Sequence, residues 1–116
     1  MKKLDALFYR TETGSEPVRE WLKELPKADK KAIGEDIKTV QLGWPLGMPL
    51  VRSLGHGLWE VRTKLPSKRI ARIIFFMNDQ NIVLVNGFIK KTQQTPQDEL
   101  ALAKQRKRYY ELSKFD

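Results

Sequence analysis

The sequence predicts an α+β domain in which a small, mostly antiparallel, curved sheet carries two N-terminal helices and one C-terminal helix. Helical patterns fill residues 17–42, strand-like patterns fill residues 50–85, and a further helical pattern follows from about residue 95. A short strand ahead of the first helix completes the order β-α-α-β-β-β-β-α. Helices packed on one face would bury the apolar side of this sheet and leave the other face, or part of it, open to a ligand.

The first half of the chain supplies the first strand and two helices. Residues 4–9 read as a short strand that ends at a polar turn. A helix follows, with Pro17 near its first position and with apolar residues at helical spacing as far as Leu25. A second helix is expected from Lys27 to Leu42, with Gly43 as its C-cap. Residues 44–49 contain two prolines and form a loop.

The second half changes to strands. Residues 58–64 alternate between the two sides of a strand, and residues 82–85 form the continuous apolar run typical of a strand buried on both faces. Thr95 is expected to be the N-cap of the last helix, with Pro96 at its first position. The expected strands are residues 50–54, 58–64, 69–77 and 82–85, and the last helix ends near residue 112.

Length and composition exclude several classes of protein. A chain of 116 residues predicts a single domain spanning 1–116. The absence of cysteine excludes disulfide scaffolds and thiol catalysis, and a single histidine excludes a two-histidine acid–base pair. No metal or cofactor motif is present, so neither is expected. No apolar run approaches the ~18 residues of a membrane span, which predicts a cytoplasmic protein without membrane contact.

The charge is strongly positive and unevenly distributed. Lys and Arg number 22 against 14 Asp and Glu, a formal net charge of +8. Residues 1–50 carry nine Lys and Arg against eight acidic residues, whereas residues 51–116 carry thirteen against six. Such an excess favours a polyanionic partner that binds mainly to the second half, although a charge that serves only solubility is the alternative.

Arg72 is the most informative residue on the predicted strands. It occupies an apolar strand, where an arginine is tolerated only if its charge is solvated or paired. Alternation on the preceding strand places Glu60, Arg62 and Lys64 on one side. Two interpretations stay open: Arg72 faces a ligand on the open face of the sheet, or it forms an ion pair with Glu60 across the strands.

Other basic residues occupy turns and the last helix. Lys90 and Lys91 follow the last strand, where they could hold a phosphate or simply protect a sheet edge. The basic run 104–108 lies beside two tyrosines, which suits nucleic acid, although such a run is usually a solvated helix face. His56, between two glycines, is a candidate for proton transfer or an incidental loop histidine.

Catalysis by these residues would rely on cations. RNA is the practicable substrate without a metal, because its 2′-hydroxyl is a built-in nucleophile that needs only alignment, proton transfer and charge neutralisation. The forked guanidinium of arginine fits the non-bridging phosphate oxygens. The basic side chains expected to contact such an RNA outside the reaction centre are His56, Lys64, Lys68, Arg69, Lys104 and Arg108.

Three motifs together resemble the RelE/ParE toxin superfamily, in its phage-derived HigB-like branch. They are Gly-Leu-Trp-Glu-Val-Arg at 57–62, Arg-Ile-Ile-Phe-Phe at 72–76 and Gly-Phe-Ile-Lys-Lys-Thr-Gln-Gln-Thr-Pro at 87–96, followed by Glu99, Ala103 and Arg106. They lie within about residues 50–110, and the helical first half fits the order of elements in the family. The last motif is long and specific.

The resemblance implies the toxin of a type II toxin–antitoxin system. Such a toxin is an endoribonuclease, or mRNA interferase, that attacks mRNA, often on the ribosome. A cognate antitoxin, commonly a helix-turn-helix protein, neutralises it. The implied catalytic residues are Arg62, Arg72, Lys90 and Lys91, with Arg72 matching the arginine that contacts the scissile phosphate.

Two departures from the family pattern concern proton transfer. RelE has a tyrosine early in its last segment, where this chain has none, and many relatives carry histidine where this chain has Asn86.

Two other functions stay open. A ParE-type toxin would inhibit DNA gyrase by binding, and a regulator would bind RNA without cleaving it. Placement of Arg62, Arg72, Lys90 and Lys91 on one face would favour the nuclease.

Overall fold

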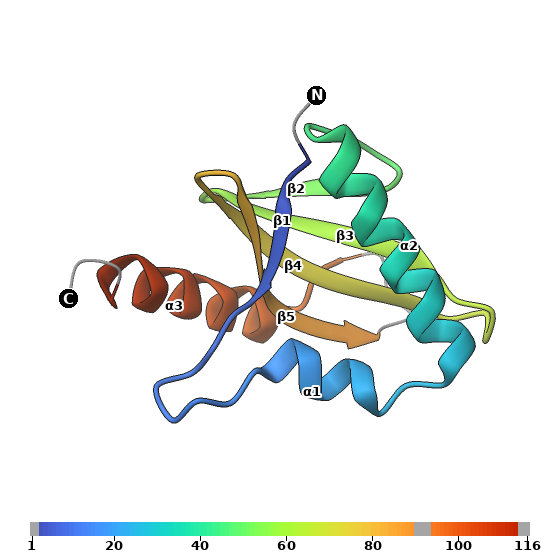
Figure 1. Ribbon diagram of the computed structural model, residues 1–116, viewed down its shortest axis with the longest axis horizontal. Helices are drawn as coiled ribbons and strands as arrows, with labels where there is room; N and C mark the ends of the chain where they lie inside the picture. Colours follow the sequence, from blue (N-terminus) through green and yellow to red (C-terminus); the bar gives the residue numbers. More distant parts are fainter. Residues whose placement is uncertain (1–2, 90–93, 114–116) are drawn as a thin grey trace.

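The computed structural model describes residues 3–89 and 94–113. Its elements are β1 (Asp5–Phe8), α1 (Pro17–Lys23), α2 (Lys27–Gly43), β2 (Val51–Gly55), β3 (Leu58–Lys64), β4 (Ile70–Asn78), β5 (Asn81–Ile89) and α3 (Gln97–Ser113). The predicted α+β class and order of elements are confirmed (Figure 1). None of the helices within the described ranges is long and apolar enough to cross a membrane.

The five strands form one mixed sheet in the order β1-β5-β4-β3-β2. β1 pairs with β5 in parallel and every other pair is antiparallel. A bulge interrupts the β4–β5 pairing, since Ile74 lies opposite Asn86 whereas Phe75 lies opposite Leu84. Val85 is therefore the extra residue, and the bulge brings Asn86 to the face of the sheet that carries Ile74.

Helices cover both faces of the sheet, so the prediction of helices on one face is wrong. α1 and α2 pack on a core that includes Val61, Ile73 and Phe75, whereas α3 packs on Ile74 and Phe76. In Figure 1, α2 crosses in front of the strands and α3 lies to the left, apart from it. Two apolar faces explain this arrangement, because each needs its own cover.

The end of β5 and the start of α3 differ from the sequence prediction. β5 runs to Ile89 instead of ending near residue 85, and α3 begins at Gln97, one residue after the predicted start. The carbonyl of Pro96 accepts the first helical hydrogen bond, from the N–H of Leu100 at 3.0 Å. The hydroxyl of Thr95, predicted to cap this helix, instead donates to Oε2 of Glu60 at 2.7 Å.

The contact between α1 and β5 depends on a glycine. Trp21 of α1 packs directly on Gly87, where a Cβ would lie 2.6 Å from Cζ3 and 3.0 Å from Cδ2 of the indole ring. Any side chain at this position would displace the ring. Gly34 in α2 is the opposite case, because a Cβ there would meet no atom within 4 Å.

We expect the two glycines to respond to alanine in opposite directions. Gly87→Ala should lower the free energy of unfolding by about 1–3 kcal/mol because it overpacks the Trp21 contact. Gly34→Ala should raise it by about 0.5–1 kcal/mol through helix propensity. Urea unfolding of both variants and the wild type measures this, and a Gly87→Ala variant as stable as the wild type would contradict the packing.

Candidate functional site

Three arginines on neighbouring strands lie on the face of the sheet that α3 partly covers. Arg52 of β2 lies opposite Glu60 of β3, and Arg62 of β3 lies opposite Arg72 of β4. Glu60 and Arg62 are two residues apart on one strand and so share a face. We call these four residues the arginine cluster. Alternation predicted the shared face of Glu60 and Arg62, and the register adds Arg72 to it.

Arg72 and Glu60 are both fully buried, at 0% exposure. Burial lowers the pKa of Arg72, the Glu60 carboxylate raises it, and the like charges of Arg62 and Arg52 lower it further. Glu60 is thus the group that offsets the buried positive charge. The expectation that Arg72 faces an open surface is wrong for this structure, and the alternative, compensation by Glu60 across the strands, describes its surroundings.

Glu60 draws together three separate parts of the chain. Its Oε1 lies 3.9 Å from Nε of Arg62 on its own strand. Its Oε2 accepts a hydrogen bond from the hydroxyl of Thr95, two residues before the start of α3. Its charge also favours the protonated form of Arg72 on β4. A single buried carboxylate therefore links β3, β4 and the segment that leads into α3.

The arginine cluster reaches solvent on one side. The Arg62 side chain is 12% exposed, and Arg52 is half-buried. Arg62 and Lys64 border an open pocket of about 350 Å³, which Asp36, Pro49 and Leu50 also line. Three arginines against Glu60, and Lys64 against Asp36, leave an excess of positive charge, so an anion would meet Arg62 and Lys64 first, with Arg72 beside Arg62 on the neighbouring strand.

Arg52 is a member of the site that sequence reasoning missed. The signal was present in the alternation of residues 51–55, which gives Arg52 and Leu54 a common face. What the sequence lacked was the pairing that sets Arg52 opposite Glu60. The register of this hairpin is set by its turn and by the shift between Ser53 and Gly55, and the sequence pattern did not show that shift.

Asn86 fastens α3 to the sheet. Its Nδ2 donates to the backbone carbonyl of Glu99 at 2.9 Å and to Oε1 of Glu99 at 3.1 Å. Arg106 of α3 donates to the carbonyl of Val85 at 2.6 Å and to Oδ1 of Asn86 at 3.2 Å. Burial lowers the pKa of Arg106, against the opposing effects of Tyr9 and Glu99. Asn86, which stands where many relatives carry histidine, therefore has a structural role in attaching α3 to the sheet.

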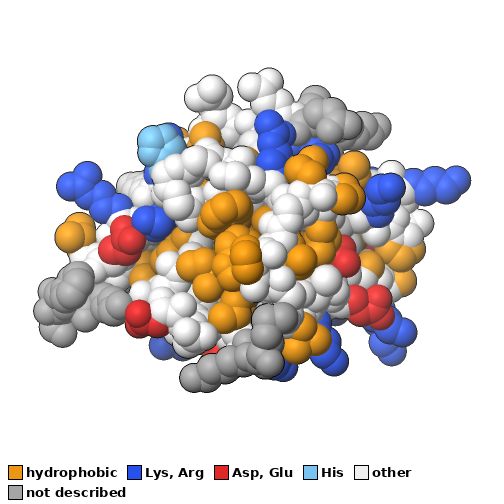
Figure 2. All heavy atoms as spheres, turned by 90° about the horizontal axis from the view of Figure 1, so that it is seen from above, with side chains coloured by type: hydrophobic (Ala, Val, Ile, Leu, Met, Phe, Trp, Pro, Cys, Tyr) orange, Lys and Arg blue, Asp and Glu red, His pale blue; other side chains and the backbone are white. Residues whose placement is uncertain are grey.

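A second basic group forms where the β2–β3 turn meets α3. His56 lies in this turn, and a pocket of about 190 Å³ is lined by His56, Lys104, Lys107, Arg108 and Glu111. We call these residues the turn–helix cluster. The structure thus brings together three residues that the sequence proposed for RNA contact: His56, Lys104 and Arg108. In Figure 2 the single histidine lies at the edge of the visible face, beside Lys and Arg side chains.

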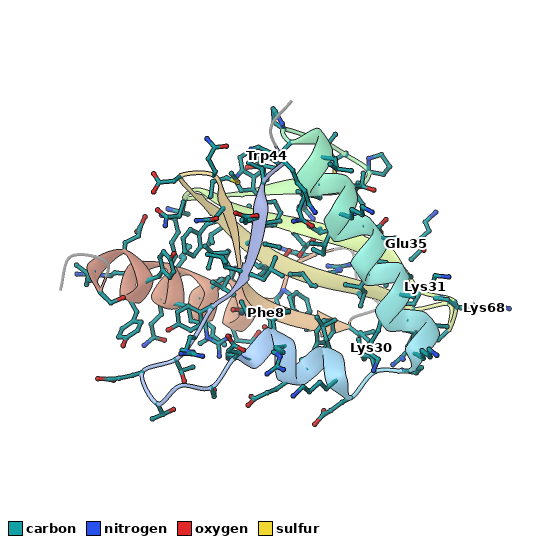
Figure 3. All side chains as sticks on the ribbon, viewed as in Figure 1. Phe8, Lys30, Lys31, Glu35, Trp44 and Lys68 are labelled. Atoms are coloured by element: carbon teal, nitrogen blue, oxygen red, sulfur yellow. The ribbon has the colours of Figure 1, made fainter. Side chains whose placement is uncertain are left out.

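Two other predicted contact residues lie in the β3–β4 turn, beside α2. Arg69 lies 3.5 Å from the buried carboxylate of Asp29, and its Nε donates to Oγ of Ser67 at 3.2 Å. The hydroxyl of Ser67 donates to the same carboxylate at 3.1 Å. These contacts tie the turn to α2. Lys68 is exposed and extends outward from the same turn at the right edge of the molecule (Figure 3).

The remaining predicted catalytic residues, Lys90 and Lys91, lie outside the described residues. Within residues 3–89 and 94–113, no group of three or more His, Asp or Glu side chains is placed to hold a metal ion. The site that can be described therefore consists of the arginine cluster and the turn–helix cluster.

A match to a family model identifies the family to which the chain belongs. The model for phage-derived Gp49-like proteins (DUF891) matches residues 20–108, a span that includes every residue of both clusters except Glu111. The chain belongs to the Gp49-like family. This family is part of the RelE/HigB-like toxin group, which is the group that the sequence motifs resemble. No curated protein gives a significant match to this Gp49-like chain.

The hydrogen bond from Thr95 to Glu60 should contribute measurably to stability. Thr95→Val keeps the shape of the side chain and removes the donor, so it should lower the free energy of unfolding by about 1.5–3 kcal/mol. Thr95→Ser keeps the hydroxyl and should lose less than half as much. Urea unfolding of the two variants tests this; a loss for Thr95→Ser as large as that for Thr95→Val would contradict a dominant contribution from the hydrogen bond.

Proposed function

We propose that this Gp49-like chain is the toxin of a type II toxin–antitoxin system and that it cleaves RNA. The observation that supports this most is the arginine cluster, in which three neighbouring strands each direct an arginine to one face of the sheet. Paired arginines can bind both non-bridging oxygens of a phosphate and neutralise the charge that grows on it during attack.

The proposed reaction is attack of the RNA 2′-hydroxyl on the adjacent phosphate without a metal ion. The new P–O2′ bond replaces the P–O5′ bond, which leaves a 2′,3′-cyclic phosphate and a 5′-hydroxyl, and the proton that the 2′-hydroxyl loses is balanced by the proton that the departing 5′-oxygen gains. Arg62 and Arg52, which reach solvent, would bind the phosphate oxygens. Arg72, buried beneath them, acts as a positioning residue that maintains positive potential and holds Glu60 in place. Lys90 and Lys91 follow β5, the strand that neighbours Arg72, and are proposed as further catalytic cations.

The proposal includes a cognate antitoxin that neutralises the toxin. A strongly basic second half predicts an acidic antitoxin segment lying across it, because complementary charges set the orientation and speed of association. The proposed substrate is mRNA that is being translated, so the ribosome is a proposed partner. A purified complex in which Arg62 and Arg52 stayed open to solvent would contradict the predicted path of the antitoxin.

A gyrase-binding toxin of the ParE type is the alternative. Dispersal of Arg62, Arg72, Lys90 and Lys91 over different faces would favour such a protein-binding toxin. Of these four, the structure describes Arg62 and Arg72, which share one face and lie directly opposite each other. This arrangement favours a site that receives a phosphate group.

Primer extension on a reporter transcript in a translating extract tests RNA cleavage. Wild type should produce discrete new 5′ ends, and Arg62→Ala should reduce the cleavage rate about 100-fold, the loss typical of one transition-state donor. Arg52→Ala should also reduce it. Lys31→Ala, which removes an exposed cation on α2, is the matched control and should cleave as the wild type does.

Arg72→Ala needs a second measurement because it leaves the Glu60 carboxylate buried beside fewer positive charges. Its thermal unfolding should therefore be compared with that of Arg62→Ala. Equal cleavage by the wild type and Arg62→Ala would contradict the proposed site. Arrest of translation without new 5′ ends would exclude cleavage, and a gyrase supercoiling assay would then test the alternative.

A further inference from the structure

We propose that the turn–helix cluster is a second phosphate-binding subsite. It would bind a phosphate of the RNA backbone at a distance from the arginine cluster. The proposal rests on the proposed function in one respect, namely that the ligand is RNA. Its own evidence is the pocket of about 190 Å³ that His56, Lys104, Lys107 and Arg108 line together with Glu111.

The β2–β3 turn has the shape that this pocket requires. Gly55, His56 and Gly57 all have left-handed backbone conformations, with φ of 81°, 56° and 75°. His56 is the one residue of the three that carries a side chain. A Cβ on Gly57 would lie 3.3 Å from Cε of Lys107. Glycine therefore lets the lysine stem lie against the turn, which brings the histidine and α3 to a common pocket.

Lys107 is held in place by its neighbours. Its Nζ lies 2.9 Å from Oε2 of Glu111 and 5.7 Å from the centre of the Phe76 ring. This contact neutralises Glu111, the acidic residue of the pocket. Positive charge from Lys104 and Arg108 is then left over at the pocket.

Lys104 and Arg108 are both exposed and lie four residues apart on α3, which places them side by side on the helix. Like charges in this spacing repel each other and oppose helix formation. A phosphate between them would turn this repulsion into attraction for both cations. The geometry thus favours an anion over a neutral or cationic ligand.

The two clusters are joined by one β-strand. Arg52 of the arginine cluster lies in β2 and His56 of the turn–helix cluster lies in the turn directly after it, four residues on, a span of at most about 13 Å at the usual rise of a strand. A short single strand of RNA can cover this distance within a few nucleotides. We infer that phosphates of one RNA strand occupy both clusters at once.

Salt dependence of binding to a non-cleavable RNA tests the subsite. The probe is a fluorescent 2′-O-methyl oligoribonucleotide, which lacks the nucleophile, and anisotropy gives its Kd from low to moderate salt. Loss of one phosphate contact from a single strand should reduce the slope of log Kd against log salt by about 0.7. We expect this reduction for Lys104→Ala/Arg108→Ala, and weaker binding for His56→Ala.

The matched control is Lys31→Ala/Lys38→Ala, which removes two exposed cations from α2 on the other side of the sheet. It should keep the wild-type slope. Thermal unfolding of both double variants confirms that they fold. The subsite is excluded if Lys104→Ala/Arg108→Ala keeps the wild-type slope, if both double variants lose slope equally, or if the wild type does not bind the probe.

The same variants separate this proposal from the proposed function. New 5′ ends in the translating extract together with an unchanged slope would retain the nuclease and exclude the subsite. A reduced slope without any new 5′ ends would retain the subsite and exclude cleavage, as for a protein that binds RNA without cutting it.

Discussion

The buried carboxylate of Glu60 is the constraint on which the candidate site depends. An isolated buried charge is strongly unfavourable, so Glu60 and Arg72, both fully buried, are tolerated because they are buried together. Removing one member of such a pair commonly costs about 3–5 kcal/mol, since the other charge is left behind. Thr95 adds a hydrogen bond to the same carboxylate. The carboxylate therefore restrains two strands and the segment that enters α3.

This arrangement divides the arginine cluster into a buried and an accessible part. Glu60 offsets the charge of Arg72, which lies out of reach of solvent. Arg62 and Arg52 lie farther out and keep positive charge available to an anion. Arg62 already lies 3.9 Å from the Glu60 carboxylate, so its side chain is oriented before any ligand arrives, which reduces the ordering that binding requires.

Local sequence patterns predicted most of the helices and strands. They did not predict features that depend on contacts between distant segments, such as the face of the sheet that α3 covers. Strand alternation predicted that Glu60 and Arg62 share a face, and helical spacing predicted α1 and α2. The packing of α3 on the second face was missed, although the apolar run at residues 82–85 already indicated a strand buried on both sides. The bulge at Val85, which brings Asn86 to α3, has no sequence signal of its own.

The misread role of Thr95 has the same origin. A Thr-Pro pair ahead of a helix is a good capping signal, and only the proximity of Glu60, 35 residues earlier, gives the hydroxyl a different partner. The candidate functional residues also depend on contacts between distant segments. Basic residues could be named from the sequence, but their division into two clusters depends on which strand lies beside which.

α3 couples the two clusters mechanically. Thr95, two residues before its start, binds Glu60 in the arginine cluster, and hydrogen bonds from Asn86 to Glu99 and from Arg106 to Val85 attach the first part and the middle of the helix to β5. Farther along, the ring of Tyr110 packs edge-on against Phe76 with centroids 5.3 Å apart. Lys104, Lys107 and Arg108 lie between these attachments. Because the same helix is held at both ends, the spacing of the two clusters is set by the fold, and an extended polyanion can match it without rearranging the protein.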